Sequence, residues 1–222
     1  MAMKRSIPIL LSLNAGYVDT AGFLALHGLF AAHVTGNFVT LGMALVSGTS
    51  GIWVKILALP VFCVVVFSSR LLASSMPKLG LPVMRTLLSL KVALLIAAAV
   101  MAITIGKDHH GDETAVIITG LLLVSAMALQ NTISRIYTNP VPATILTGPL
   151  TQMMIDVADL VRGVSLTERA VAKARISTIA TNVASFAIGC GISALLFSRV
   201  GMWCFLIPPI LAFIPTMMGE TK

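Results

Sequence analysis

Charged residues are scarce in this chain: Asp, Glu, Lys and Arg make up 10% of it, whereas a soluble domain usually carries about 25%. Hydrophobic residues make up 57%. The chain therefore lacks the polar residues that a soluble globule needs on its surface, and most of it must face lipid or its own interior. No polar linker of domain-boundary length is present, so we expect one integral membrane domain over residues 1–222.

Aromatic residues are also few, with only two Trp and two Tyr. The chain thus offers little that could stack on bases, and it contains no RNA-binding motif. Its net charge of +7 is better explained by the gathering of Lys and Arg in cytoplasmic loops. We expect the lipid bilayer and a small-molecule substrate as partners, and no nucleic acid; a homodimer is left open.

Motifs of enzyme and cofactor chemistry are missing as well. The three cysteines, Cys63, Cys190 and Cys204, lie in apolar runs without metal-ligand spacing, which favours a packing role. The chain has no phosphate-binding Gly-rich loop, no HExxH, no GxSxG and no nucleophile–base set. We therefore expect no enzyme activity, no cofactor, no metal and no ATP-driven transport.

Apolar runs of membrane-spanning length are abundant. About 20 apolar residues cross a bilayer, and the candidate segments are 6–28, 29–48, 52–74, 84–106, 114–137, 141–161, 176–197 and 200–217. The predicted fold class is an all-α, polytopic membrane bundle.

Basic residues predict the topology of these segments. Three regions are predicted to be cytoplasmic because they carry basic residues. They are the N-terminus, the loop with Arg70, Lys78 and Arg85, and the loop with Arg162, Arg169, Lys173 and Arg175. Eight simple crossings conflict with this pattern. Six net crossings agree with it if 6–28 and 29–48 together cross once, as do 114–137 and 141–161. Plain six- and eight-span models stay open, and Lys55 lies on the wrong side for our preferred topology.

Polar residues recur at half the chain length. Asp19 precedes Thr35 by 16 positions, Asn131 precedes Thr147 by 16, and the two copies are 112 positions apart. Because each half would have three net crossings, we predict two inverted-topology repeats, about 6–106 and 114–217, each with a broken or re-entrant element. Irregular backbone at membrane depth needs protein or a water-filled cavity around it.

The predicted substrate site lies at the two breaks. Thr35 precedes Gly36 and Asn37, and Thr147 precedes Gly148 and Pro149. A half-helix that begins inside the membrane directs free N–H groups and a positive dipole end at a cavity, which suits an anionic or carbonyl-bearing ligand. Gln130 and Asn131 would lie beside this site. The alternative is that these small residues only let helices approach closely.

Asp19 and His33 are the candidate coupling residues. A carboxyl group inside a predicted span is costly to bury and commonly marks a path for ions or substrate. We predict that Asp19 loads and releases a proton or cation and that His33 gates protons. The alternatives are a core histidine and a buried carboxyl paired with a residue such as Arg135.

Other polar residues are expected to be interfacial. Lys91 is close enough to the inside face to extend its side chain there. Asp156 and Asp159 are expected to pair with Arg162. Ser165 and Glu168 form a capping box, which predicts a short basic amphipathic helix over residues 166–175.

The run Gly16-Tyr17-Val18-Asp19, then Phe23, Phe30 and Thr35-Gly36-Asn37, resembles the YoaK-like family of small bacterial inner-membrane proteins of unknown function. The resemblance extends over essentially the full length and includes Gln130-Asn131 and Thr147-Gly148. It implies a bacterial multi-pass protein of about six spans. Pro149 stands where Asn37 stands in the first copy, which departs from a symmetric amide pair.

The leading functional hypothesis is a multi-pass secondary transporter or permease of the bacterial inner membrane, with a cytoplasmic N-terminus. Its substrate would be a small polar or anionic metabolite, with proton or cation coupling. A passive channel and a non-transporting membrane scaffold or assembly protein are the alternatives.

Overall fold

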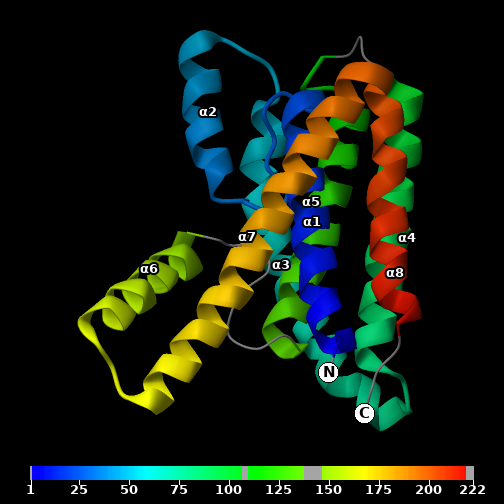
Figure 1. Ribbon diagram of the computed structural model, residues 1–222. Helices are drawn as coiled ribbons and strands as arrows, with labels where there is room; N and C mark the ends of the chain where they lie inside the picture. The colour runs from blue at the N-terminus through cyan, green and yellow to red at the C-terminus, as the bar shows by residue number, and fades with distance from the viewer. Residues whose placement is uncertain (1, 107–109, 138–146, 219–222) are drawn as a thin grey trace.

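The computed structural model describes all residues except 1, 107–109, 138–146 and 219–222, and it shows a bundle of helices (Figure 1). The elements are α1 (Ala2–Ala25), α2 (Gly36–Ser47), α3 (Ile52–Ser75), η1 (Met76–Leu79), α4 (Val83–Ile105), α5 (Thr114–Tyr137), α6 (Thr147–Arg162), α7 (Leu166–Val200), η2 (Gly201–Leu206) and α8 (Ile207–Met217). The described part of the chain contains no strand, and the predicted all-α class is confirmed.

Five stretches of the described chain are long and apolar enough to cross a membrane: Ser6–Ala25, Ile52–Lys78, Val83–Ile105, Thr114–Ile136 and Leu166–Met217. The last stretch holds both α7 and α8, which run in opposite directions in Figure 1. The predicted spans 52–74, 84–106 and 114–137 correspond to α3, α4 and α5. The chain is a helical membrane protein.

The predicted boundary between residues 175 and 176 is wrong. Residues 166–175 and 176–197 were expected to form two helices, but α7 is a single helix of 35 residues. The predicted capping box does start it, because the Ser165 side chain accepts from the Glu168 N–H. The hydroxyls of Thr178 and Thr181 then donate to carbonyls four residues earlier. Their polar atoms are thus satisfied within the helix, which continues through this stretch.

Helix α1 packs most extensively on α7, and it also contacts α5, α8 and η2. At their crossing the two backbones touch: a Cβ added to Gly16 would lie 2.1 Å from the Phe186 carbonyl oxygen, and one on Gly189 would lie 2.1 Å from that of Leu13. No side chain fits at either position. Small residues at such crossings are the usual means by which helices associate in membranes.

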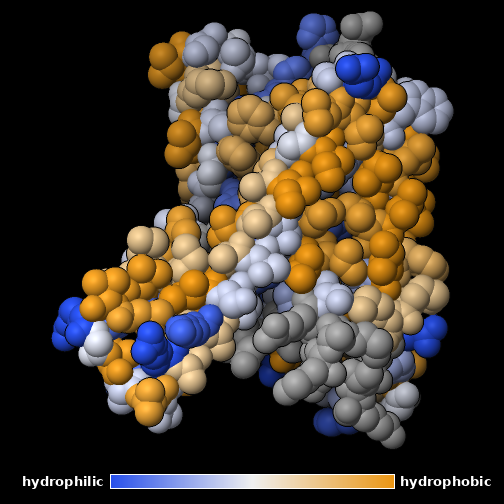
Figure 2. All heavy atoms as spheres, viewed as in Figure 1, coloured by the Kyte–Doolittle hydropathy of each residue, from blue (hydrophilic) through white to orange (hydrophobic). Residues whose placement is uncertain are grey.

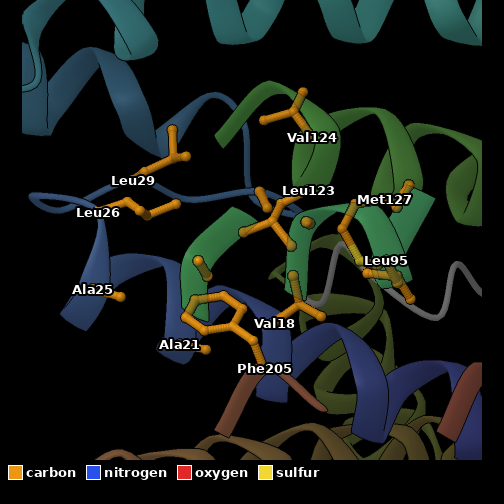
Figure 3. Packing of buried hydrophobic residues seen from close by; sticks show 14 of the residues in the cluster. Val18, Ala21, Ala25, Leu26, Leu29, Leu95, Leu123, Val124, Met127 and Phe205 are labelled. Atoms are coloured by element: carbon orange, nitrogen blue, oxygen red, sulfur yellow. The ribbon is translucent and has the colours of Figure 1, made fainter. Parts of the chain in front are cut away.

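The largest apolar core lies where α1, α4, α5 and η2 meet the segment after α1 (Figure 3). Val18 of α1, Leu95 of α4 and Leu123 of α5 meet there with Leu26 and Leu29. All five are at most 1% exposed. The segment between α1 and α2 is therefore part of the core.

The chain reverses twice between α1 and α3. Helix α1 ends at Ala25, and His27 and Gly28 follow with positive φ values of 52° and 82°, which turn the chain back. The segment 26–35 then descends and α2 runs back toward the end of the bundle that α1 had reached (Figure 1). There a Cβ on Gly51 would lie 2.9 Å from the His27 Cβ, so α3 begins beside the end of α1. Segment 29–48 therefore contains an irregular stretch and the 12-residue helix α2 rather than one continuous helix.

The outer surface suits a lipid environment. Figure 2 shows apolar residues over the upper part of α7 and α8, and charged residues at the tip where α6 meets α7. Exposed apolar side chains on these helices include Ile188, Leu195, Ile210 and Phe213. A patch of this kind on a soluble protein would be exceptional.

Candidate functional site

Asp19 fastens the segment between α1 and α2 to α1. Its Oδ1 accepts from the N–H groups of Ala31 (2.8 Å) and Ala32 (2.6 Å). Its Oδ2 accepts from the His33 N–H (3.2 Å) and lies 2.6 Å from the His33 Nδ1. Asp19 is 3% exposed. The carboxylate therefore occupies a ring of donors of the kind that would otherwise bind an external anion.

Asn37 forms a second fastening point. Its Oδ1 accepts from the Phe30 N–H and its Nδ2 donates to the Phe30 carbonyl, both at 2.8 Å. This pair of hydrogen bonds suits an amide, because an amide offers an acceptor and a donor side by side. Gly36 is required next to it, since an added Cβ would lie 2.9 Å from the Phe30 ring. Thr35 is exposed and its side chain makes no capping bond.

The first turn of α2 differs from the prediction. Its N–H groups were expected to be free and directed at a cavity. Instead Gly36 donates to His33 (2.8 Å), Asn37 to Val34 (3.1 Å) and Phe38 to Thr35 (3.2 Å), all through backbone carbonyls. The segment before α2 turns tightly enough to satisfy these donors itself. The positive end of α2 is therefore closed in this structure.

His33 links this arrangement to α7. Its ring stacks edge-on against Phe186, with ring centroids 5.2 Å apart. The His33 side chain is 33% exposed, whereas that of Asp19 is 4% exposed. His33 is thus the member of the pair that solvent or a solute can reach. The suggested partner Arg135 is exposed and Asp19 pairs with His33 instead.

The second half arranges its corresponding residues differently. Asn131 is 7% exposed, and its Nδ2 donates to the Met127 carbonyl (3.1 Å) within α5. Thr147 and Gly148 are exposed at the start of α6, which packs chiefly on α7. The segment that would correspond to 26–35 lies outside the described residues. The structure thus joins Asp19, His33 and Asn37 to one segment, while Thr147 and Gly148 share no described contact with them.

Gln130 belongs to a separate polar group around Lys91. The expectation that Lys91 reaches the membrane surface is wrong: it is fully buried, and its Nζ donates to the Gln130 Oε1. The Gln130 Nε2 donates to the Leu11 carbonyl (2.9 Å), so this group joins α4, α5 and α1. The signal available in the sequence was a charge within an apolar run, which by itself suggests function.

A second lysine, Lys55 of α3, is also buried, at 2% exposed. Its Nζ donates to the Thr40 carbonyl of α2 at 3.5 Å. Asp112 lies nearby, since it accepts from the Trp53 N–H at 3.4 Å. Lys55 therefore fastens α2 to α3, which explains its place on what looked like the wrong side of the membrane.

An ion pair holds α6 to α7. Asp156 was expected to pair with Arg162, but it accepts from Arg175 through Nε (2.6 Å) and Nη2 (2.5 Å), and from Gln152 (3.0 Å). The hydrogen bonds from Arg175 hold the pKa of Asp156 below its ordinary value. The expected pairing does occur at Asp159, whose carboxylate lies 3.9 Å from Arg162.

Comparison with known proteins gives a family and no activity. No curated protein and no solved structure matches the chain significantly. A family model described as "Protein of unknown function (DUF1275)" matches residues 7–218, nearly the whole chain. The prediction of an uncharacterised family is confirmed, and this helical membrane protein belongs to the DUF1275 family.

Proposed function

We propose that this protein is a secondary transporter or permease for a small polar or anionic metabolite. The observation that carries the proposal is the break between α1 and α2, an irregular segment held inside the bundle by Asp19 and Asn37. A protein that needed only to span the membrane would have little reason to keep such a break. Carriers use broken helices of this kind to build a site near the middle of the bilayer.

The pattern of helix packing supports two repeats of opposite orientation. The contact of α1 with α7 corresponds to the contact of α5 with α3. The contact of α2 with α3 corresponds in the same way to the contact of α6 with α7. Helix α4 packs on α5 as α8 packs on α1. These three pairings therefore recur when α1–α4 are exchanged for α5–α8. We infer repeats at about 6–106 and 114–217 and six net crossings.

The basic residues support the orientation. The start of α1 and the connection from α3 to α4 lie at the same end of the bundle in Figure 1. That connection carries Lys78, and the first turn of α4 carries Arg85. We propose that this end faces the cytoplasm of a bacterial cell and that the N-terminus is cytoplasmic.

Asp19 and His33 are the proposed coupling pair of this break. Their side chains are 2.6 Å apart, and only His33 is accessible. A proton that arrives at the His33 ring would weaken neither of the Oδ1 bonds that hold the segment. The rest of the proposed substrate path consists of Thr35, Gly36, Asn37, Gln130, Asn131, Thr147 and Gly148.

The test is flux into proteoliposomes that contain a trapped pH-sensitive dye. A panel of small polar and anionic metabolites would be added with and without an imposed proton gradient. A carrier gives saturable, gradient-dependent entry that His33→Gln uncouples, while the exposed control Asp159→Asn behaves as the wild type. Entry that neither saturates nor responds to the gradient identifies a channel instead.

One observation favours a non-transporting scaffold as the second candidate. Asp19 and Asn37 direct their hydrogen bonds at the chain's own backbone, which is also what a purely structural break requires. A scaffold gives no flux for any solute in the panel. In that case the variants at these positions would lower stability alone.

A further inference from the structure

The polar group around Lys91 is incomplete. An ammonium carries three N–H donors, and among the described residues only Gln130 accepts one of them. Leu11, whose carbonyl accepts from Gln130, and Leu87, one helical turn before Lys91, are fully buried apolar residues. Donors buried without acceptors are rare in folded proteins and usually indicate a missing water, ion or ligand.

Asn14 is on the same helix as Leu11, which holds this group to α1. It follows Leu11, whose carbonyl holds Gln130, by one helical turn, about 4.5 Å along α1. Asn14 is 0% exposed, and neither its Oδ1 nor its Nδ2 has a hydrogen-bond partner. Lys91 of α4 and Asn14 of α1 thus both hold unused polar atoms, and Gln130 of α5 links Lys91 to α1.

The unused atoms are mainly donors, and the group carries a positive charge when Lys91 is protonated. Lys91 and the Asn14 amide provide N–H groups, while the Gln130 orientation is fixed by its bond to the Leu11 carbonyl. No carboxylate in the described part of the chain lies within ion-pair distance of Lys91. An unpaired ammonium in a dry interior is strongly unfavourable unless a counter-charge accompanies it.

We propose that Lys91, Gln130 and Asn14 form a binding site for a small monovalent anion, such as a carboxylate. The proposal rests on the proposed transport function, for which it selects anions as the substrate class. Gln130 positions the ammonium, and Asn14 donates to the anion from the opposite side. Because all three side chains are fully buried, the anion enters only when the helices separate.

Charged groups on the surrounding elements do not satisfy Lys91. On α3 and α5, Arg70 and Arg135 are exposed, and Asp19 of α1 is engaged by the segment 31–33. The described residues of α8 include no charged side chain. When Lys91 is protonated, the described residues therefore supply no counter-charge for it.

The test measures thermal unfolding of the full-length protein in detergent. The reference salt is the sodium salt of a bulky sulfonate buffer, which formate, acetate, chloride or nitrate replaces at constant ionic strength. At least one of these probes should raise the melting temperature saturably. Lys91→Met should weaken the apparent affinity at least tenfold. Lys55→Met is the matched control, because it also removes a buried lysine but should keep the response.

Asn14→Asp provides an independent test, should Lys91→Met fail to fold. This variant is isosteric, breaks no hydrogen bond of the side chain, and introduces a carboxylate at the proposed site. We expect it to melt above the wild type in the reference salt and to lose its response to the probes. A structural role of Asn14 predicts a lower melting temperature instead.

The proposal is overturned if no probe stabilises the wild type, or if Lys91→Met responds as the wild type does. Its failure is distinct from that of the proposed function. Flux of a neutral solute with no anion response would refute the anion site and keep the transporter. Anion binding that depends on Lys91, with no flux for any solute, would refute the transporter alone.

Discussion

The carboxylate of Asp19 is the most informative single group to change. Asp19→Asn removes its charge and keeps the shape of the side chain. Asparagine keeps Oδ1, which accepts from Ala31 and Ala32, and replaces Oδ2 with an amide nitrogen. That nitrogen faces the His33 N–H, which loses its acceptor at 3.2 Å. The His33 ring can follow by changing its tautomer, so we count no loss there.

The magnitude follows from these bonds. A buried N–H left without an acceptor costs about 1–3 kcal/mol. The two bonds to Oδ1 lose their charge assistance, about 1 kcal/mol each, since charged hydrogen bonds are about twice as strong as neutral ones. The sum is about 3–5 kcal/mol. For a chain of this size 1 kcal/mol shifts the melting temperature by about 2–4 °C, so we expect a decrease of roughly 6–20 °C.

The assay is thermal unfolding in detergent together with hydrogen exchange of the segment 26–36. Asp159→Asn is the control, because its carboxylate is 45% exposed and 3.9 Å from its partner, a pair worth about 0–1 kcal/mol. Hydrogen exchange should accelerate at residues 31–33 before it does elsewhere. A melting temperature for Asp19→Asn as close to the wild type as that of the control would refute this account.

Three further predictions concern packing, the second fastening point and pH. Gly189→Ala should lower the free energy of unfolding by at least about 2 kcal/mol, because the added Cβ would meet the backbone of α1. Gly191 has open space around it, so Gly191→Ala should be neutral or stabilising by up to about 1 kcal/mol in thermal unfolding. Asn37→Ala should cost about 2–4 kcal/mol in the same assay by leaving a buried N–H and carbonyl unpaired, while Thr35→Ala should change it by less than about 0.5 kcal/mol. Because the pKa of Asp156 is lowered in the folded state, its stabilising contribution is complete above its unfolded pKa of about 3.9 and is lost as the pH falls through the lower folded value. The difference in melting temperature between the wild type and Asp156→Asn should therefore shrink below about pH 4, and a constant difference would contradict the assignment.

Much of the fold could be predicted because it depends on local composition. Apolar runs of 20 or more residues bounded by Gly and Pro gave the positions of α3, α4 and α5. The break near Thr35 was predictable, because small and polar residues interrupt an otherwise apolar run. The continuity of α7 was not, since a basic stretch reads as a separate surface helix when its neighbours are unknown.

The partners of the polar residues could not be predicted, because they are distant in the sequence. Asp19 meets N–H groups 12–14 positions away, and Lys91 meets Gln130 39 positions away. Spacing alone cannot show whether a buried charge faces backbone, another side chain or lipid. The sequence therefore indicated that Asp19 is an unusual buried carboxyl group. It did not indicate that Lys91 is buried, because the surroundings of Lys91 depend on how α4 and α5 pack.

The fastening of the segment 26–35 by Asp19 has a consequence for how this protein is made. Asp19 lies within the first span, Ser6–Ala25, and that span leaves the ribosome before its hydrogen-bond donors at residues 31–33 do. A bare carboxylate at this depth costs about 2.5–3.5 kcal/mol during insertion. The first helix is therefore more stable in the bilayer once the following residues fold back over it. We expect its insertion to be completed as residues 31–33 emerge.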